Sequence, residues 1–257
     1  MCSWYGVECN DKKEITSLFV VYQRIDTIPP GSLSQIKTIE ELTLANNKFT
    51  ILPTNELNQI TALRVLDLTN NLLTSVDKDV VSGLPNLLAL ILSGNQISRI
   101  QRDALDALPR LVTLYLDENK LSLFKKEYIE KISTLDFLDL SQNPLLDIEE
   151  DSFESTTQLT NIRIENTFLT SLPETIFNPI KAKLKILSLA DNKALSFLPY
   201  NLFEPLTSLR VLDLSRLDLS FSFPHYLCSA VASGKLGVST NMSPYINRIC
   251  VRSTPKF

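Results

Sequence analysis

One spacing of apolar residues recurs along most of the chain. The pattern L-x-x-L-x-L-x-x-N-x-L, with Ile or Val at some leucine positions, is repeated in five steps of 24 residues and then two of 25. Its first positions are Ile39, Leu63, Leu87, Leu111, Leu135, Leu159, Leu184 and Leu209. A weaker copy lies one step of 24 residues upstream and consists of Ile15, Leu18, Val20 and Ile25. So constant a period predicts an array of similar units, each stabilised by its neighbours.

The positions within one unit predict a short strand followed by a turn. Apolar residues alternate in L-x-x-L-x-L, which indicates a strand with one buried face. Stacked units would pair these strands in parallel and bury a continuous core. An Asn amide both donates and accepts, so the Asn that follows can satisfy backbone groups at the turn. We name this column the Asn ladder; it consists of Asn47, Asn71, Asn95, Asn119, Asn143 and Asn192, with Thr167 and Leu217 in the two remaining units.

This spacing resembles that of the leucine-rich repeat family over residues 15–219. The resemblance implies an α/β fold, a solenoid or horseshoe with a parallel β-sheet on its concave face. It also implies an N-terminal cap at 1–14, about nine repeats at 15–219 and a C-terminal cap at 220–257. The return segments resemble the 24-residue repeats of extracellular receptors and matrix proteins. Where plant-type repeats carry glycine, most units have Thr or Ser, as at Thr50 and Ser98, which explains why 45 leucines accompany only 6 glycines.

The four cysteines lie in the two predicted caps. Residues 2–9 read C-x-W-x-G-V-x-C, which resembles the N-terminal cap of plant and protist leucine-rich repeat receptors. In that cap the two cysteines pair and the Trp, here Trp4, covers the first repeat. Strands about 4.8 Å apart would separate the caps far beyond the roughly 7 Å that a disulfide spans between Cα atoms. We therefore expect the pairs Cys2–Cys9 and Cys228–Cys250; the alternative is four reduced cysteines in a cytosolic protein.

Paired cap cysteines favour an oxidising compartment. Met1 directly precedes Cys2, which leaves no room for a signal peptide in this sequence. No apolar run approaches the roughly 18 residues of a membrane span. We expect an extracellular or cell-surface ectodomain, or a fragment of one. A cytoplasmic protein is the alternative, and the flanking sequence would distinguish the two.

The variable positions of the predicted strands should line the exposed face of the sheet. Most of them are small or polar, but the middle repeats place apolar and aromatic residues beside acids. The candidate ligand-binding residues are Leu88, Ile91, Val112, Tyr115, Asp117, Phe137, Asp139 and Arg163, with Glu118 and Asp136 on the same rim. Aromatic anchors within a charged rim are typical of recognition surfaces, and an acidic rim favours a partner that carries Lys, Arg or an amine. The alternatives are isolated apolar residues without a role, and a binding edge or loop elsewhere.

Charge and motifs argue against several other classes of function. The net charge is −4, with 25 basic and 29 acidic residues and no basic run, so no nucleic-acid partner is expected. The single histidine, His225, lies outside the repeats, and no metal or nucleotide motif is present. Acid pairs such as Glu149 and Glu150 fall where no cleft is expected. We predict a protein that is not an enzyme and that binds no cofactor or metal.

The resemblance implies recognition of a protein or peptide ligand by the ectodomain of a receptor-like protein or receptor kinase. Because this sequence contains no kinase or membrane segment, signalling would need further sequence or a co-receptor. Two other functions stay open. One is a soluble secreted inhibitor of a foreign hydrolase, and the other is a cytosolic scaffold or regulatory subunit.

Overall fold

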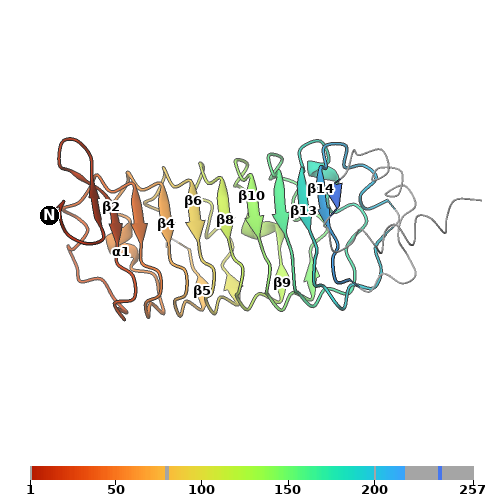
Figure 1. The fold of residues 1–257 in the computed structure, drawn as a ribbon, viewed down its shortest axis with the longest axis horizontal. Coiled ribbons are helices and arrows are strands. Elements are labelled where there is room, and N and C mark those ends of the chain that lie inside the picture. The colour runs from red at the N-terminus through yellow and green to blue at the C-terminus, as the bar shows by residue number, and fades with distance from the viewer. Residues whose placement is uncertain (1, 79–80, 200, 218–236, 239–257) are drawn as a thin grey trace, which may run out of the picture.

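A computed structural model describes residues 2–78, 81–199, 201–217 and 237–238. The chain forms a stack of similar turns, and each turn adds one short strand to an 11-stranded sheet that runs the length of the stack (Figure 1). Neighbouring strands are parallel throughout, except for the antiparallel first pair. The predicted solenoid with a parallel sheet is confirmed.

The strands follow one another in the sheet in chain order. They are β1 (Val7–Cys9), β2 (Ile15–Phe19), β3 (Glu41–Thr43), β4 (Val65–Asp67), β6 (Ala89–Ile91), β8 (Thr113–Tyr115), β10 (Phe137–Asp139), β12 (Asn161–Arg163), β13 (Ile186–Ser188), β14 (Val211–Asp213) and β15 (Gly237–Val238). Each strand is short because the apolar alternation of a repeat covers only a few residues before the chain turns at the Asn ladder.

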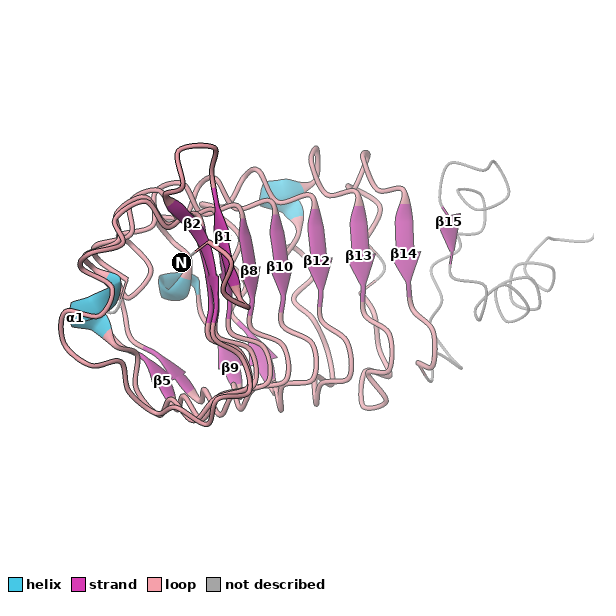
Figure 2. Cartoon of the chain, turned by 60° about the vertical axis from the view of Figure 1, so that its left-hand side comes forward, coloured by secondary structure: helices cyan, strands magenta, loops and turns pink. Residues whose placement is uncertain are grey.

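The side opposite the sheet contains little helix (Figure 2). Its elements are α1 (Thr54–Leu57), the 3-10 helices η1 (Lys126–Tyr128) and η2 (Asn178–Ile180), and two small parallel sheets, in which β5 (Ser75–Val76) pairs with β7 (Arg99–Ile100) and β9 (Leu123–Phe124) pairs with β11 (Asp147–Ile148). Helices this short gain few hydrogen bonds for the residues they order, so the return segments are mostly turns held by their buried side chains.

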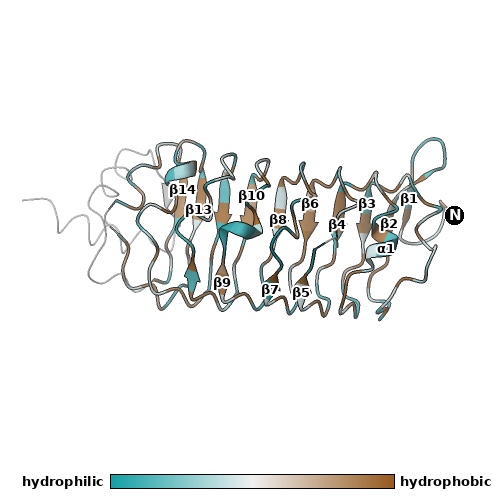
Figure 3. Cartoon of the chain, turned by 180° about the vertical axis from the view of Figure 1, so that it is seen from behind, coloured by the Kyte–Doolittle hydropathy of each residue, from teal (hydrophilic) through white to brown (hydrophobic). Residues whose placement is uncertain are grey.

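The strand register follows the repeat and separates two faces. Leu90, Leu114 and Leu138 are aligned on β6, β8 and β10, and all three are fully buried. Thr113 and Tyr115, on either side of Leu114, point the other way and are only half-buried. We name the surface formed by these outward residues the sheet face. The hydrophobic residues of successive turns lie in line along the stack (Figure 3).

Aromatic residues fill part of the core opposite the sheet. The ring centroids of Phe124 and Phe153 are 6.3 Å apart, and those of Phe153 and Phe177 are 6.0 Å apart. All three side chains are buried. Contacts of this kind add roughly 0.5–1.5 kcal/mol per pair to the effect of burial. The middle and later turns are therefore joined on this side by contacts between aromatic rings as well as by leucines.

The Asn ladder lies where the chain turns away from each strand. Asn95 Nδ2 donates to the carbonyls of Leu68, Leu92 and Ser93 at 3.0, 3.0 and 3.3 Å, and its Oδ1 accepts from the N–H of Leu73 at 3.1 Å. Two of these partners belong to the preceding turn, so the side chain ties two turns together. Equivalent donor contacts are made by Asn47, Asn71, Asn119 and Asn143.

Thr167 occupies the same position with a hydroxyl in place of an amide. Its Oγ1 donates to Oδ1 of Asn192, and its N–H donates to the same atom at 2.8 Å. Asn192 in turn donates to the carbonyls of Ile164 and Leu189 at 2.6 and 2.8 Å. A hydroxyl has fewer hydrogen-bonding groups than an amide, so the ladder makes fewer contacts at Thr167.

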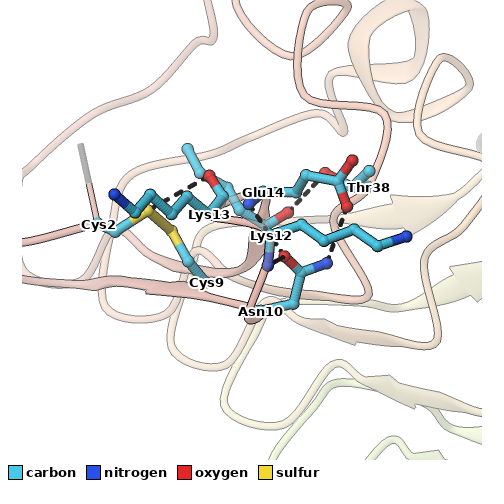
Figure 4. The surroundings of a disulfide bond; sticks show 8 residues. Cys2, Cys9, Asn10, Lys12, Lys13, Glu14 and Thr38 are labelled. Carbon is cyan, nitrogen blue, oxygen red and sulfur yellow. Dashed lines mark hydrogen bonds between the residues drawn. A yellow bond between two sulfur atoms is a disulfide. The ribbon is translucent and has the colours of Figure 1, made fainter.

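In the segment predicted as the N-terminal cap, a disulfide joins Cys2 to Cys9 at the end of β1, and their Cα atoms are 5.7 Å apart (Figure 4). Trp4 is 66% exposed, so the implied role of covering the first repeat is wrong. The backbone of the cap covers the repeat instead. β1 pairs with β2, and the N–H of Phe19 donates to the carbonyl of Gly6 at 2.8 Å.

Gly6 permits this close approach of the cap to the first repeat. It has a φ of +81°, and a Cβ at this position would lie 2.5 Å from the carbonyl oxygen of Phe19. Only glycine meets both conditions without strain. The second expected disulfide, Cys228–Cys250, and His225 lie outside the described residues.

Candidate ligand-binding face

An aromatic pair lies in the middle of the sheet face. Tyr115 ends β8 and Phe137 begins β10, so the two side chains are diagonal neighbours on adjacent strands. Their ring centroids are 4.8 Å apart and the ring planes are tilted by 41°. Both side chains are half-buried, which holds the rings in place and leaves part of their surface to solvent. We name these two residues the aromatic pair.

Arg163 extends this group onto the next strand. Its guanidinium carbon lies 5.7 Å from the centroid of the Phe137 ring, within the range of a cation–π contact. Its Nη1 is 3.8 Å from Oδ2 of Asp139, with which it is in register. The Arg163 side chain is 52% exposed and that of Asp139 is 8% exposed. The charge that a partner meets beside the aromatic pair is therefore the guanidinium.

Asp139 does not provide the exposed rim charge that its position in the sequence predicts. Its Oδ1 accepts the N–H of Ser141 at 2.9 Å, and Asp67 makes the same contact with Thr69 in an earlier repeat. Burial raises the pKa of the Asp139 carboxyl, and the hydrogen bonds from Ser141 oppose that shift. An aspartate at this position shapes the turn after the strand. Asp67 and Asp213 make the same contact but are only half-buried, so the burial of Asp139 comes from its neighbours on the sheet face.

The other predicted residues lie around the aromatic pair. Ile91 is in register with Tyr115 on the preceding strand. Leu88 and Val112 lie one residue before β6 and β8, where the N–H of Val112 donates to the carbonyl of Leu88 at 2.8 Å. Val112 is exposed, whereas Leu88 and Ile91 are half-buried. These residues form an apolar margin of the pair. Leu88 and Val112 lie at the N-terminal ends of β6 and β8, and Ile91 lies on the strand before Tyr115.

The acidic part of the rim lies beyond the C-terminal ends of the strands. The Ser93 hydroxyl donates to Oδ1 of Asp117 at 2.6 Å, and Gln142 Nε2 donates to Oε1 of Glu118 at 3.2 Å. Glu118 is exposed and Asp117 is half-buried. Asp136, by contrast, lies one residue before β10 and accepts the Thr160 hydroxyl at 2.7 Å. The predicted acidic residues therefore lie at both ends of the strands and do not form one continuous rim.

Three further residues of the sheet face were not predicted as site residues. Ile186 and Val211 are 37% and 40% exposed, on β13 and β14. Ser188 lies on β13 in register with Arg163. The third position of the repeat is apolar at Ile186 and Val211 and could have indicated them. Nothing in the sequence distinguishes Ser188 from the other small polar residues of the sheet face.

No three His, Cys, Asp or Glu side chains gather as metal ligands in the part of the chain that the structure describes. Among those same residues, no helix is long and apolar enough to cross a membrane.

A family model described as Leucine rich repeat matches residues 13–73, 61–121 and 157–219. The chain belongs to the leucine-rich repeat family. A solved structure of a leucine-rich repeat protein from Leptospira interrogans is similar, with a TM-score of 0.64 and 23% sequence identity. The similarity covers 86% of this chain and 65% of that one, and at this identity it supports the fold alone. No curated protein sequence matches the chain.

Leucine-rich repeats are typical of protein-interaction modules, and this family and fold are usually non-catalytic. Within this chain, the inward residues of the strands recur because the core needs them, and the outward residues vary from strand to strand.

Proposed function

We propose that this leucine-rich repeat chain is a non-catalytic recognition module that binds a protein or peptide ligand on its sheet face. The observation that carries the proposal is the aromatic pair, Tyr115 and Phe137, half-exposed in the middle of a sheet face whose other outward strand residues are mainly polar. Rings that are already ordered before binding supply a large contact area at little cost in side-chain entropy, which is typical of binding hot spots.

The charges around the aromatic pair favour one orientation of a bound ligand. Arg163 offers a cation on the next strand, and Glu118 offers an exposed carboxylate beyond the strand ends. A ligand that anchors an apolar side chain on the pair would meet opposite charges on two sides. The basic group that the acidic rim favours would lie on the Glu118 side, which sets orientation more than affinity.

A selection from a random peptide library displayed on phage tests this proposal. Peptides selected on the unmodified chain are measured against the double variant Tyr115→Ala, Phe137→Ala. The matched control is Leu146→Ala, Phe168→Ala, which removes two side chains that are 64% and 60% exposed and lie outside the sheet strands. We expect the first variant to lose at least about tenfold in affinity and the control to lose less than about twofold. The reverse result would place binding on the other surface.

We propose an extracellular setting for this module, as the ectodomain of a receptor-like protein or receptor kinase or as a fragment of one. The bonded Cys2 and Cys9 and the cap motif support this setting, because such bonds persist in oxidising compartments. A receptor of this kind without its own kinase would signal through a co-receptor. Sequencing the transcript upstream and downstream of the region that encodes this chain tests the proposal. A signal peptide with a membrane span would support it, a signal peptide alone would favour a secreted inhibitor, and neither would favour a cytosolic scaffold.

A further inference from the structure

A buried hydroxyl without a hydrogen-bond partner lies on the sheet face. Ser188 is 6% exposed, and its Oγ has no hydrogen-bond partner among the described residues. Buried hydroxyls are nearly always hydrogen-bonded to protein or water. Ser188 occupies the fifth position of its repeat and therefore belongs to the outward residues of β13, on the same face as the aromatic pair.

Ser188 lies between two opposite charges. Its neighbours in register are Arg163 on β12 and Asp213 on β14. Strands about 4.8 Å apart put the Cα atoms of the two charged residues roughly 10 Å from each other. Arg163 contacts Asp139 on its other side, and Asp213 Oδ1 accepts the N–H of Ser215 at 2.9 Å. We name Arg163, Ser188 and Asp213 the polar row.

The polar row presents a hydrogen-bond donor at one end and an acceptor at the other. The guanidinium of Arg163 only donates, the carboxylate of Asp213 only accepts, and a hydroxyl can do both. Beside the row, two residues earlier on β13 and β14, lie the exposed apolar side chains of Ile186 and Val211. The surface therefore combines the polar row, which has a donor at one end and an acceptor at the other, with the apolar side chains of Ile186 and Val211, which we name the apolar shelf.

We propose that the polar row and this shelf bind an amide side chain, Gln or Asn, of a peptide that is anchored on the aromatic pair. The proposal rests on the function proposed above. The amide oxygen accepts from Arg163, its NH2 group donates to Asp213, and the Ser188 hydroxyl completes the contacts after the side chains that cover it shift. The methylene groups of the ligand side chain pack on Ile186 and Val211.

The polar row discriminates against similar side chains. A carboxylate held by Arg163 would be repelled by Asp213 at the other end of the row. An ammonium group held by Asp213 would likewise be repelled by Arg163. Methionine has the length of Gln but leaves the hydroxyl without a partner. A site built to hydrogen-bond a ligand group rejects analogues that lack the group more strongly than an apolar pocket rejects a change of size.

A set of four short peptides tests the subsite. β13 is two strands beyond β10, a distance of roughly 10 Å, which an extended peptide spans in about three residues. The probe is acetyl-Phe-Gly-Gly-Gln-Gly-amide, and Glu, Lys or Met replaces Gln in the other three. Affinity is measured by NMR titration of the isotope-labelled chain, following the backbone amides of Leu187 and Ser188. We expect the Gln peptide to bind at least about fivefold more tightly than each of the others.

Two serine variants show whether the hydroxyl causes this preference. Ser188→Ala should reduce the advantage of the Gln peptide to less than about twofold and leave the affinity of the Met peptide unchanged. The matched control, Ser196→Ala, changes an exposed serine outside the sheet strands and should have no effect. A Gln peptide that binds no better than the Met peptide, or an unchanged preference in Ser188→Ala, would overturn the subsite and leave an ordered water as the partner of the hydroxyl.

Other outcomes separate the subsite from the proposed function. If all four peptides bind equally and weaken together in Ser188→Ala, the ligand's backbone amide is the group recognised, and the side-chain assignment is overturned. If Tyr115→Ala with Phe137→Ala weakens all four peptides while Gln has no advantage, the subsite fails and the proposed function stands. If that double variant binds every peptide as tightly as the unmodified chain, the proposed function fails.

Discussion

The two faces of the same strands differ in how strictly their residues repeat. On the core face, Leu114 and Leu138 are identical, aligned and fully buried. On the sheet face, the residues that follow them are Tyr115 and Asp139, which differ in size, charge and burial. The fold therefore depends on the residues that recur, and recognition depends on the residues that vary. If this division holds, substitutions on the core face should change stability and substitutions on the sheet face should change binding.

The largest effect is expected on the core face. Leu114→Ala removes a fully buried side chain from the middle of the stack and leaves a cavity between neighbouring turns, which should cost roughly 2–5 kcal/mol of unfolding free energy. Urea unfolding followed by circular dichroism measures this loss. Val112→Ala, two residues away and exposed, is the control and should cost much less. Equal losses in the two variants would contradict the division between faces.

The Asn ladder should give the next largest effect. Asn95→Ala leaves the buried N–H of Leu73 without its partner, at a cost of about 1–3 kcal/mol. The carbonyls of Leu68 and Leu92 each lose one of two ladder donors and keep Asn71 and Asn119. Gln96→Ala, at the adjacent exposed position, should leave the unfolding curve unchanged. If the two variants unfold at the same denaturant concentration, the ladder does not stabilise the stack as described.

Restoring the ladder should have a smaller effect in the opposite direction. Thr167→Asn supplies the amide that the other turns use, and it should raise the unfolding free energy by roughly 0.5–1.5 kcal/mol. The same urea titration measures the gain. A loss of stability would mean that the later, 25-residue repeats have adapted to the shorter side chain.

Two buried acids should respond to pH in opposite ways. The N–H groups of Leu33 and Gly31 donate to Glu56 at 2.9 and 2.7 Å, and these bonds lower the pKa of its carboxyl. The stabilisation by Glu56 is present above its unfolded pKa of about 4.3 and is lost as the pH falls through its lower folded pKa. Burial raises the pKa of Asp139, so its ionised form weakens the fold at neutral pH.

Neutral replacements separate these two contributions. Glu56→Gln should flatten the fall in melting temperature below about pH 4. Asp139→Asn keeps an acceptor for the N–H of Ser141 and should be no less stable than the unmodified chain at pH 7. Melting curves recorded from about pH 2 to about pH 7 test both expectations. An acid-sensitive Glu56→Gln variant, or a clearly destabilised Asp139→Asn variant, would contradict the roles assigned to the two carboxyls.

The sequence predicts the core face better than the sheet face for a physical reason. Leu114 and Asn95 recur at fixed spacing because every turn needs the same core and the same turn contacts, so their places follow from the period. The burial of Asp139 and the exposure of Trp4 depend on what the neighbouring turns and the cap place around them. The unpartnered hydroxyl of Ser188 likewise depends on the side chains of adjacent strands, which a single repeat does not specify.

The central claim is that the aromatic pair is the place where the ligand binds, and photo-crosslinking tests it most directly. The photoreactive residue p-benzoylphenylalanine replaces Phe137 in one variant and Phe168, 60% exposed and outside the sheet strands, in the other. Each variant is irradiated with a peptide selected on the unmodified chain, and the adducts are measured by intact mass. We predict an adduct at position 137 and none at 168. An adduct at 168 without one at 137 would contradict the account.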